Sequence, residues 1–215
     1  MGRSIRIQEL SAPETEQMPD PLVEPEALGE TIGWKELFGR SAPVEVEIGF
    51  GKGRYLIHAA QARPEADFLG REWALPFVRL VRYRIYRRRI RNVKLVRADA
   101  LDILGQRIPA GSVRAMHVLF PDPWPKKRHH KRRLVSPGFA QMVVRVLEPG
   151  GAINVATDHA GYAEVIEPTL DAAQGLERLP GFGLDGDLAE LTNYGTKYAR
   201  EGRSFHAWSY RKTRG

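Results

Sequence analysis

Cysteine is absent from this 215-residue chain, and long apolar runs are absent too. Without cysteine the protein has no disulfide bonds, thiolate metal ligands or cysteine nucleophile, which agrees with a reducing compartment. No stretch approaches the roughly 20 apolar residues of a membrane-spanning helix, and the N-terminus lacks the apolar centre of a signal peptide. We therefore expect a cytoplasmic protein with no membrane partner.

Groups of metal ligands are also scarce. The adjacent pair His129 and His130 lies within a run of Lys and Arg, whose charge would repel a metal ion. We expect no metal.

Positive charge is in excess and is unevenly distributed. The net charge is +7 and the isoelectric point is about 9.8, although residues 1–30 carry seven acidic and only two basic residues. The positive residues cluster at 79–97 and 126–133, whereas scattered charges would indicate only a solvated surface. This distribution predicts a polyanionic partner such as RNA, DNA or an acidic membrane surface.

The most unusual stretch is Phe120–Arg133, which reads FPDPWPKKRHHKRR. An apolar run ends there at one acidic residue, Asp122, between two prolines, and six Lys or Arg occupy the eight positions 126–133. The prolines restrict the backbone around the carboxylate, and the charge block attracts a polyanion. This juxtaposition suggests chemistry performed on a nucleic acid.

Residues 1–40 are rich in Glu and Pro and show no periodicity, so we expect an acidic, flexible N-terminal arm. Trp34, Leu37 and Phe38 have the spacing of one amphipathic helical turn, which would dock the arm onto the body. The arm is either simply disordered or an electrostatic lid over the basic surface. Residues 41–215 are expected to form one domain.

Residues 44–53, VEVEIGFGKG, predict a strand, a glycine loop and the start of a helix. Glycines allow positive φ angles and let a ligand approach the backbone at the helix N-terminus. Glu47 stands near the end of a strand that should be buried, where an unpaired charge is costly. Glu45 is more readily explained by pairing with a nearby arginine. The glycines of the loop are Gly49, Gly51 and Gly53.

Two further acidic residues end predicted strands. Phe68–Trp73 is expected to be the second strand, and Glu72 near its end is placed to accept hydrogen bonds from the hydroxyls of a ribose. Asp99 follows a short third strand at 93–96 and is placed to hold the amine of an adenine. Its alternative role is the N-cap of the next helix.

Helices and strands alternate through the rest of the chain. The arginines of the helix expected at 74–91 form either a solvated face or an RNA contact. The alternation predicts an α/β fold with a mostly parallel, doubly wound sheet. The expected elements are a helix at 74–91, a strand at 116–120, a helix capped by Ser136 and Pro137, a strand at 152–156, a helix at 161–173 and a β region at 192–212.

A carboxylate stands at the end of each of the five expected parallel strands. Ligands of such sheets gather at the carboxyl ends of the strands, so these side chains should share one rim. Five carboxylates on one rim of a basic protein are hard to explain as surface decoration. They are Glu47, Glu72, Asp99, Asp122 and Asp158.

With these residues the chain resembles the bacterial-type tRNA (guanine-N7)-methyltransferases. The resemblance covers residues 44–211 and rests chiefly on the specific motif at 120–133, Phe-Pro-Asp-Pro-Trp-x-Lys-Lys-Arg-His-x-Lys-Arg-Arg. The glycine loop is shared with many enzymes that use S-adenosyl-L-methionine (SAM). Further matching motifs are Gly-x-Glu at 70–72, Thr-Asp at 157–158 and Thr-Lys-Tyr at 196–198.

The resemblance implies a Rossmann-like, class I SAM-dependent methyltransferase sheet with an antiparallel C-terminal strand region. It implies methyl transfer from SAM to N7 of the variable-loop guanine of tRNA (position 46), without an obligate protein partner. The matching cofactor-site positions are Glu47, Gly49, Gly51, Gly53, Glu72, Asp99 and Asp122, and Asp122 is also the implied catalytic residue. The matching substrate-contact positions are Lys126, Asp158, Thr196, Lys197 and Tyr198, and the RNA-contacting run is Arg128, His129, His130, Lys131, Arg132 and Arg133.

The chain departs from the family pattern at two places. The family usually continues Thr-Lys-Tyr with Glu, where this chain has Ala199. The usual basic lead-in before the first strand is replaced by the acidic arm. Neither a guanine contact at Ala199 nor a role of the lead-in in tRNA binding carries over to this chain.

Three other functions are weighed against this one. A non-catalytic RNA-binding module on the same fold is the alternative, and the intact glycine loop with Glu47 and Glu72 argues against it. An adenine amino-methyltransferase would need Asp/Asn-Pro-Pro-aromatic after the fourth strand, where this chain has Asp-Pro-Trp. A nicotinamide dehydrogenase is disfavoured by the Gly-x-Gly-x-Gly spacing.

The chemistry expected at the rim follows from guanine N7, whose free lone pair needs no deprotonation. We hypothesise that Asp122 and Asp158 accept hydrogen bonds from the N1 and N2 edge of guanine and stabilise the cationic product. Lys126–Arg133 would hold phosphates. Trp124 either stacks on a base or packs to order the proline loop.

Overall fold

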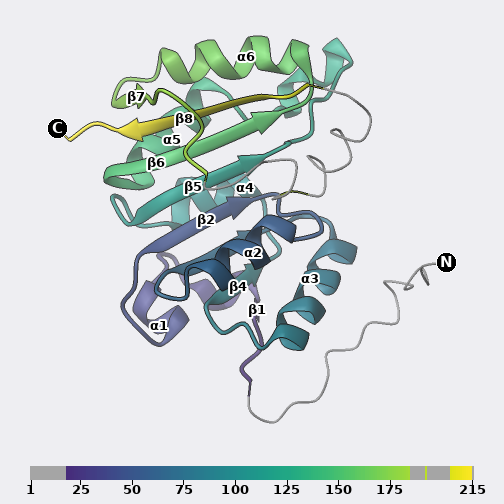
Figure 1. The fold of residues 1–215 in the computed structure, drawn as a ribbon, viewed down its shortest axis with the longest axis vertical. Helices are drawn as coiled ribbons and strands as arrows, with labels where there is room; N and C mark the ends of the chain where they lie inside the picture. Colours follow the sequence, from purple (N-terminus) through teal and green to yellow (C-terminus); the bar gives the residue numbers. More distant parts are fainter. Residues whose placement is uncertain (1–17, 185–191, 193–203, 215) are drawn as a thin grey trace.

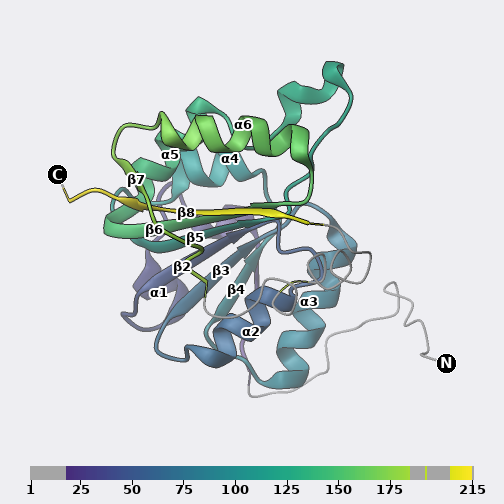
Figure 2. The same cartoon turned by 45° about the horizontal axis from the view of Figure 1, so that its top comes forward.

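The structure, a computed structural model, describes residues 18–184, 192 and 204–214. One sheet carries helices on both of its faces (Figures 1 and 2). The strands are β1 (Leu22–Val23), β2 (Val44–Ile48), β3 (Asp67–Arg71), β4 (Val93–Val96), β5 (Val113–Leu119), β6 (Leu147–Thr157), β7 (Leu176–Arg178) and β8 (His206–Lys212). The helices are α1 (Trp34–Phe38), α2 (Arg54–Ala62), α3 (Leu75–Arg88), α4 (Ala100–Asp102), α5 (Pro137–Val146) and α6 (Ala160–Asp171), with short helical turns η2 (Pro25–Leu28), η3 (Ile103–Arg107) and η4 (Lys127–Arg132).

The strand order in the described sheet is β1-β4-β3-β2-β5-β6-β8-β7. β1 to β6 pair in parallel, whereas β8 runs antiparallel to both β6 and β7. The chain moves outward from β2 through β3 to β4 and then crosses to the other side with β5 and β6, which is a doubly wound topology. Figure 1 shows β2, β5 and β6 pointing one way and β8 the other. The predicted fold class is confirmed.

Two apolar layers sandwich the sheet. Helices α2 and α3 cover one face and α4, α5 and α6 cover the other (Figure 2). Strand β2 is buried along its whole length, and its alternate residues Val44, Val46 and Ile48 pack with α5 and α6. Because side chains alternate along a strand, Glu45 and Glu47 face the α2 side. The sequence therefore places two carboxylates inside the α2 layer.

The described part of the N-terminal arm, residues 18–40, packs on the body. Leu22 pairs with Leu95, so β1 forms the edge of the sheet beside β4. Leu28 and Ile32 are buried. These apolar residues insert singly between prolines and glutamates, so they leave no periodic pattern in the sequence. Residues 1–17 lie outside the described residues.

The helical turn expected at Trp34 is present as α1. The indole Nε1 of Trp34 donates a hydrogen bond of 2.9 Å to the hydroxyl of Ser112, the residue before β5. Trp34 and Leu37 pack against the same core as α5 and α6. The turn therefore docks the preceding segment, as the sequence predicts.

Local signals set the helix ends. The Ser136 hydroxyl accepts a hydrogen bond of 3.2 Å from the amide of Phe139, and Pro137 is the first residue of α5, as predicted. Helix α3 ends at Arg88, three residues before the expected end, because Arg89 adopts a left-handed φ of 54°. That conformation terminates helices.

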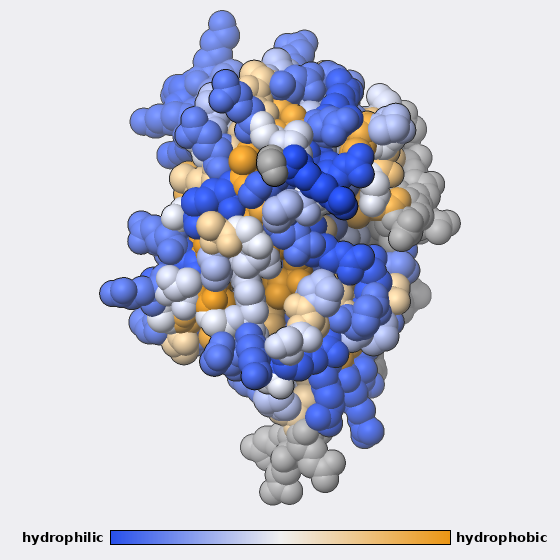
Figure 3. Space-filling model, turned by 90° about the vertical axis from the view of Figure 1, so that its left-hand side faces the viewer, coloured by the Kyte–Doolittle hydropathy of each residue, from blue (hydrophilic) through white to orange (hydrophobic). Residues whose placement is uncertain are grey.

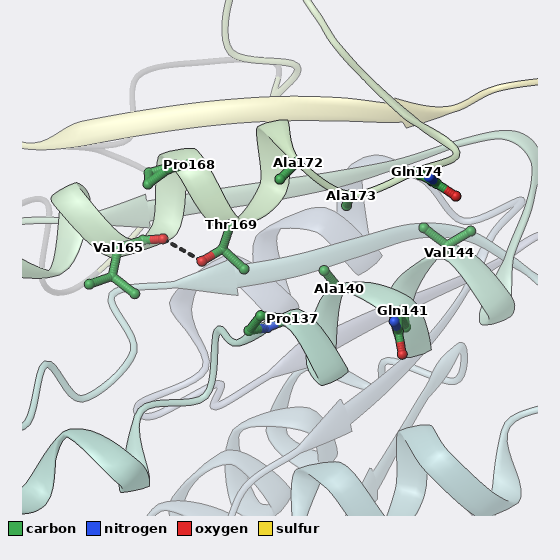
Figure 4. Close-up of a pocket in the computed structure, with 10 residues that line it drawn as sticks. All are labelled: Pro137, Ala140, Gln141, Val144, Val165, Pro168, Thr169, Ala172, Ala173 and Gln174. Atoms are coloured by element: carbon green, nitrogen blue, oxygen red, sulfur yellow. Dashed lines mark hydrogen bonds between the residues drawn. The ribbon is translucent and has the colours of Figure 1, made fainter.

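Two surface features lie away from the predicted site residues. The face at the amino ends of the parallel strands is mostly hydrophilic, with small separate apolar spots (Figure 3). A groove of about 840 Å³ lies between α5 and α6 and is lined mostly by small apolar residues such as Ala140 and Val165 (Figure 4). None of the predicted site residues lines this groove. Within the described residues, no helix is long and apolar enough to cross a membrane.

A candidate active site at the carboxyl ends of the parallel strands

The topology brings the five predicted carboxylates to one rim of the sheet. β4, β3, β2, β5 and β6 are neighbours and all run in parallel, so their carboxyl ends meet at one edge. Each of the five residues stands within three positions of the end of its strand. In order across the sheet they are Asp99, Glu72, Glu47, Asp122 and Asp158.

The glycine loop joins β2 to α2 at the centre of this rim. Gly49, Gly51 and Gly53 have φ values of 77°, 49° and 69°, which only glycine adopts without strain. A Cβ on Gly49 would meet nothing within 4 Å, so open space lies above the loop. A Cβ on Gly53 would lie 2.5 Å from the Val81 side chain, so this glycine also lets α3 pack closely. Gly49 is therefore exposed at the rim, whereas Gly51 and Gly53 are buried in the turn that leads into α2.

Glu72 is fixed by three backbone amides. Its Oε2 accepts a hydrogen bond of 2.9 Å from Gly51, and its Oε1 accepts from Trp73 at 2.8 Å and from Ala74 at 2.9 Å. A carboxylate offers about four acceptor positions, so capacity remains on Oε2 for a ligand hydroxyl. The sequence predicts the position of Glu72 but not its bond to the glycine loop.

Glu47 is a buried carboxyl group with one oxygen that accepts no hydrogen bond from the described residues. The residue is 4% exposed, and its Oε2 has no hydrogen-bond partner among the described residues. Burial, with a smaller contribution from the charge of Glu72, raises the pKa of Glu47 to about 8, against a hydrogen bond from the Leu56 amide. An unsatisfied buried acceptor beside an open glycine loop is suited to a ligand that brings a cationic or hydrogen-bonding group.

Asp99 caps a helix, which was its alternative role. Its Oδ1 accepts hydrogen bonds from the amides of Leu101 at 2.8 Å and Asp102 at 3.3 Å. The residue is exposed, and both contacts use the same oxygen. Oδ2 can therefore still receive a ligand amine, so the cap and the adenine contact are compatible.

Arg71 is a rim residue that sequence reasoning missed. It precedes Glu72 at the end of β3, and its buried Nε has no hydrogen-bond partner among the described residues. Burial lowers the pKa of Arg71, while the charges of Asp99 and Glu72 oppose that shift. The side chain therefore lies near both acids. The signal that could have identified Arg71 is its position directly before Glu72 at the end of a predicted strand.

The loop that carries Asp122 has an unusual backbone. Phe120 and Trp124 have φ values of 59° and 43°, a region that bulky residues rarely adopt. Phe120 is held by a hydrogen bond of 2.8 Å from its amide to the carbonyl of Ala156. Asp122 itself is exposed. Strain of this kind persists where the surroundings enforce it and is frequent at functional sites.

Trp124 packs within its own loop. The Arg132 guanidinium lies 4.9 Å from the centre of the indole ring, and the His129 ring meets it edge-on at 5.8 Å. This is the packing role that stands as the alternative to base stacking. The indole is half-buried, so part of it remains accessible.

The basic run follows as the turn η4, which projects beyond the carboxyl end of the sheet at the upper right of Figure 1. His129 is half-buried and Arg133 turns inward, with hydrogen bonds to two backbone carbonyls. The exposed members are Lys126, Lys127, Arg128, His130, Lys131 and Arg132.

The far side of the rim is formed by the end of β6. Asp158 is half-buried, and the amide of the next residue, His159, bonds to the hydroxyl of the buried Thr157 at 3.2 Å. The remaining predicted substrate contacts, at 196–198, lie outside the described residues. Among the described residues, no group of His, Cys, Asp or Glu could hold a metal ion.

Glu45 belongs to a buried polar network, also missed from the sequence. It bonds to Arg63 at 2.8 Å and to Nε2 of His117 at 3.0 Å, which confirms its expected pairing with an arginine. Asn154 lies 3.3 Å from Nδ1 of His117, and its Oδ1 accepts a hydrogen bond from Ser209. The network crosses β2, β5, β6 and β8 and satisfies polar groups inside the α2 layer.

Relatives were found for most of the chain. A family model described as "Putative methyltransferase" matches residues 41–208. The tRNA (guanine-N(7)-)-methyltransferase of Alkalilimnicola ehrlichii is 41% identical over 187 residues, 86% of this chain and 78% of that protein. The chain belongs to this methyltransferase family.

A second member of the family, from Chromohalobacter salexigens, is 43% identical over 65% of this chain and 56% of its own length. Solved structures share the fold at lower identity. The 16S rRNA methyltransferase KamB superposes with a TM-score of 0.64 at 16% identity, covering 84% of this chain and 92% of that one. The aminoglycoside resistance methyltransferase NpmB1 gives 0.60 at 18% identity, over 83% and 91%.

Proposed function

We propose that this protein methylates N7 of a guanine in the variable loop of tRNA (position 46) with SAM as the donor. The observation that carries the proposal is the Phe120–Arg133 segment. It places the exposed Asp122 on the same rim as Glu47 and Glu72, directly before an exposed cationic turn. The family membership of the chain supports the same conclusion.

The rim has the residues to bind SAM. Gly49 leaves open space above the loop, Glu47 has an unsatisfied buried oxygen, and Glu72 is held in place with acceptor capacity left. We assign Glu72 to the ribose hydroxyls, Asp99 to the adenine amine and Glu47 with the glycine loop to the methionine portion. When bound, SAM supplies an electrophilic methyl group on a sulfonium.

The protein's part in the chemistry is positioning and charge stabilisation. The N7 lone pair of guanine forms the new bond without loss of a proton, and the base acquires a positive charge as the methyl leaves sulfur. Asp122 and Asp158 orient the guanine through its N1–H and N2–H donors and stabilise that charge. Asp122 is the proposed catalytic residue.

The substrate approaches through the basic turn. The exposed side chains from Lys126 to Arg132 would contact phosphates, which is how proteins position nucleic acids without reading their sequence. Lys126, Asp158 and the 196–198 segment are proposed to contact the target nucleotide. The proposed setting is the cytoplasm, with tRNA as the partner and no membrane or metal.

The proposal is tested by incubating the protein with unmodified tRNA and methyl-labelled SAM, followed by mapping of the methylated base through cleavage at N7-methylguanosine. We expect label in the variable loop only. Label elsewhere, or on another atom, would refute the assignment. Calorimetric titration with SAM separates the enzyme from an RNA-binding module, because only the enzyme requires SAM to bind.

A further inference from the structure

Arg133, the last residue of the basic run, is held differently from its neighbours. Lys131 and Arg132 are exposed, whereas Arg133 is half-buried. Its Nε donates a hydrogen bond of 2.8 Å to the carbonyl of Pro123, and its Nη1 donates one of 3.2 Å to the carbonyl of Gly161. The guanidinium carbon also lies 4.9 Å from the centre of the Tyr162 ring.

These contacts join the Asp122 loop to a rigid part of the core. Pro123 is the residue after Asp122, and Gly161 is in the first turn of α6. Tyr162 is fully buried, and its hydroxyl accepts a hydrogen bond of 2.9 Å from the amide of Val135. The part of α6 that Arg133 contacts therefore cannot move without disturbing the core.

The loop has little means of holding itself. Pro121, Pro123 and Pro125 have no backbone N–H, so three of its five residues from 121 to 125 cannot donate a hydrogen bond. Positive φ angles at Phe120 and Trp124 add strain at both ends. A loop with few donors and a strained backbone needs a donor from outside, and the Arg133 fork supplies one to the carbonyl beside Asp122.

Arg133 and Asp122 also act on the same buried group. Burial raises the pKa of the Tyr162 hydroxyl and the charge of Asp122 adds to this, whereas the Val135 hydrogen bond and the charge of Arg133 oppose it. Both charged groups therefore face the buried Tyr162. The contact that links Arg133 to the Asp122 loop is the hydrogen bond to the Pro123 carbonyl.

We propose that Arg133 is a positioning residue for Asp122 and not a phosphate contact. It ties the backbone next to Asp122 to the start of α6, which follows the second proposed guanine ligand, Asp158. This inference rests on the proposed function, and it changes the role assigned to Arg133 by the sequence. Lys131 and Arg132, exposed on the same run, keep the role of RNA contacts.

The kinetic test compares Arg133→Ala, Arg133→Lys and Lys131→Ala with the wild type. A lysine keeps the charge but cannot reproduce the planar fork that reaches two carbonyls. We expect both Arg133 variants to lose kcat at saturating tRNA, by about 100-fold for alanine, because misplacing a catalytic group by about 1 Å costs this much. Their Kd for tRNA and its salt dependence should match the wild type, whereas Lys131→Ala should weaken binding with a shallower slope.

The opposite pattern overturns the proposal. An Arg133→Lys protein with wild-type kcat would show that charge alone suffices. An Arg133→Ala protein with unchanged kcat and a shallower salt slope would show a phosphate contact. If thermal denaturation shows that the Arg133→Ala protein is not folded, Arg133→Lys alone decides between the positioning role and the phosphate contact.

A second readout does not depend on methyl transfer. With 5-fluorotryptophan at the four tryptophans, the ¹⁹F resonance of Trp124 is identified by its loss in Trp124→Phe. Arg133→Lys should shift this resonance and leave that of Trp34 unchanged, and the control Arg114→Lys, an exposed position of β5, should shift neither. An unmoved Trp124 resonance overturns the inference even in an active enzyme, while a wild type that methylates no tRNA overturns only the proposed function.

Discussion

The backbone amide of Gly51 donates a hydrogen bond of 2.9 Å to the carboxylate of Glu72. The glycine loop and the end of β3 therefore hold each other in place across the proposed cofactor site. The second carboxylate oxygen accepts two more hydrogen bonds, from the amides of Trp73 and Ala74. Glu72 thus has a structural duty besides the proposed contact to ribose.

Replacing Glu72 by alanine should affect both duties. We expect the free energy of unfolding to fall by about 1 to 3 kcal/mol, because backbone amides lose their acceptor, and SAM affinity to fall by at least about 10-fold. Thermal denaturation and calorimetric titration measure the two effects. Glu65→Ala, at an exposed acid before β3, is the control and should change neither. Wild-type SAM affinity in Glu72→Ala would rule out the ribose contact.

The buried Glu47 should make stability depend on pH. Its pKa is raised to about 8 in the folded protein, against about 4.5 in the unfolded chain. Between these pH values the folded state binds more protons than the unfolded state. The contribution of protonated Glu47 to the free energy of unfolding is therefore complete below about pH 4.5 and is lost as the pH rises towards 8.

Melting temperatures measured without SAM should therefore fall from pH 5 to pH 8 more steeply for the wild type than for Glu47→Gln. The glutamine keeps the shape of the side chain and cannot ionise. Parallel pH profiles for the two proteins would show that Glu47 does not titrate in this range.

Asp122→Asn should separate catalysis from binding. Because Asp122 is exposed on the rim and not part of the core, the variant should fold normally. We expect kcat to fall by about 100- to 1,000-fold, as for other removed transition-state contacts, while the Kd for tRNA changes little. Single-turnover methylation and filter binding measure these quantities. A joint loss of binding and activity would argue that Asp122 acts in recognition.

The exposed lysines of the basic turn should contribute to tRNA affinity through salt-sensitive contacts. For Lys127→Ala with Lys131→Ala, the slope of log Kd against log salt concentration should decrease by about 0.7 to 0.9 for each phosphate that is no longer neutralised. Arg114→Ala removes the same kind of charge at an exposed position of β5 and should leave the slope unchanged. If all variants share the wild-type slope, the turn does not bind phosphates.

Much of the parallel sheet could be read from local patterns. Val44, Val46 and Ile48 alternate with acids on β2, and the glycines that follow leave few conformations for the turn. Carboxylates after successive parallel strands fall on one rim by topology alone. The rim was therefore predictable without any knowledge of side-chain contacts.

Features that depend on three-dimensional contacts were not predictable. Arg133 looks like its exposed neighbours in the sequence, and only the position of Pro123 and Gly161 reveals its inward direction. His117 is an exception in an apolar strand, but its bonds to Glu45 and Asn154 require the register of three strands. The packing of Leu28 and Ile32 similarly depends on surfaces formed much later in the chain.

The left-handed backbone at Phe120 and Trp124 has a consequence for how this protein can be altered. Each such residue costs about 1 to 3 kcal/mol, which glycine would largely avoid. The packing of Phe120 against the core and of the Trp124 ring against Arg132 offsets this strain. A glycine at either position would relieve the strain, lose this packing and loosen the loop that carries Asp122, so turnover should fall whatever the effect on stability.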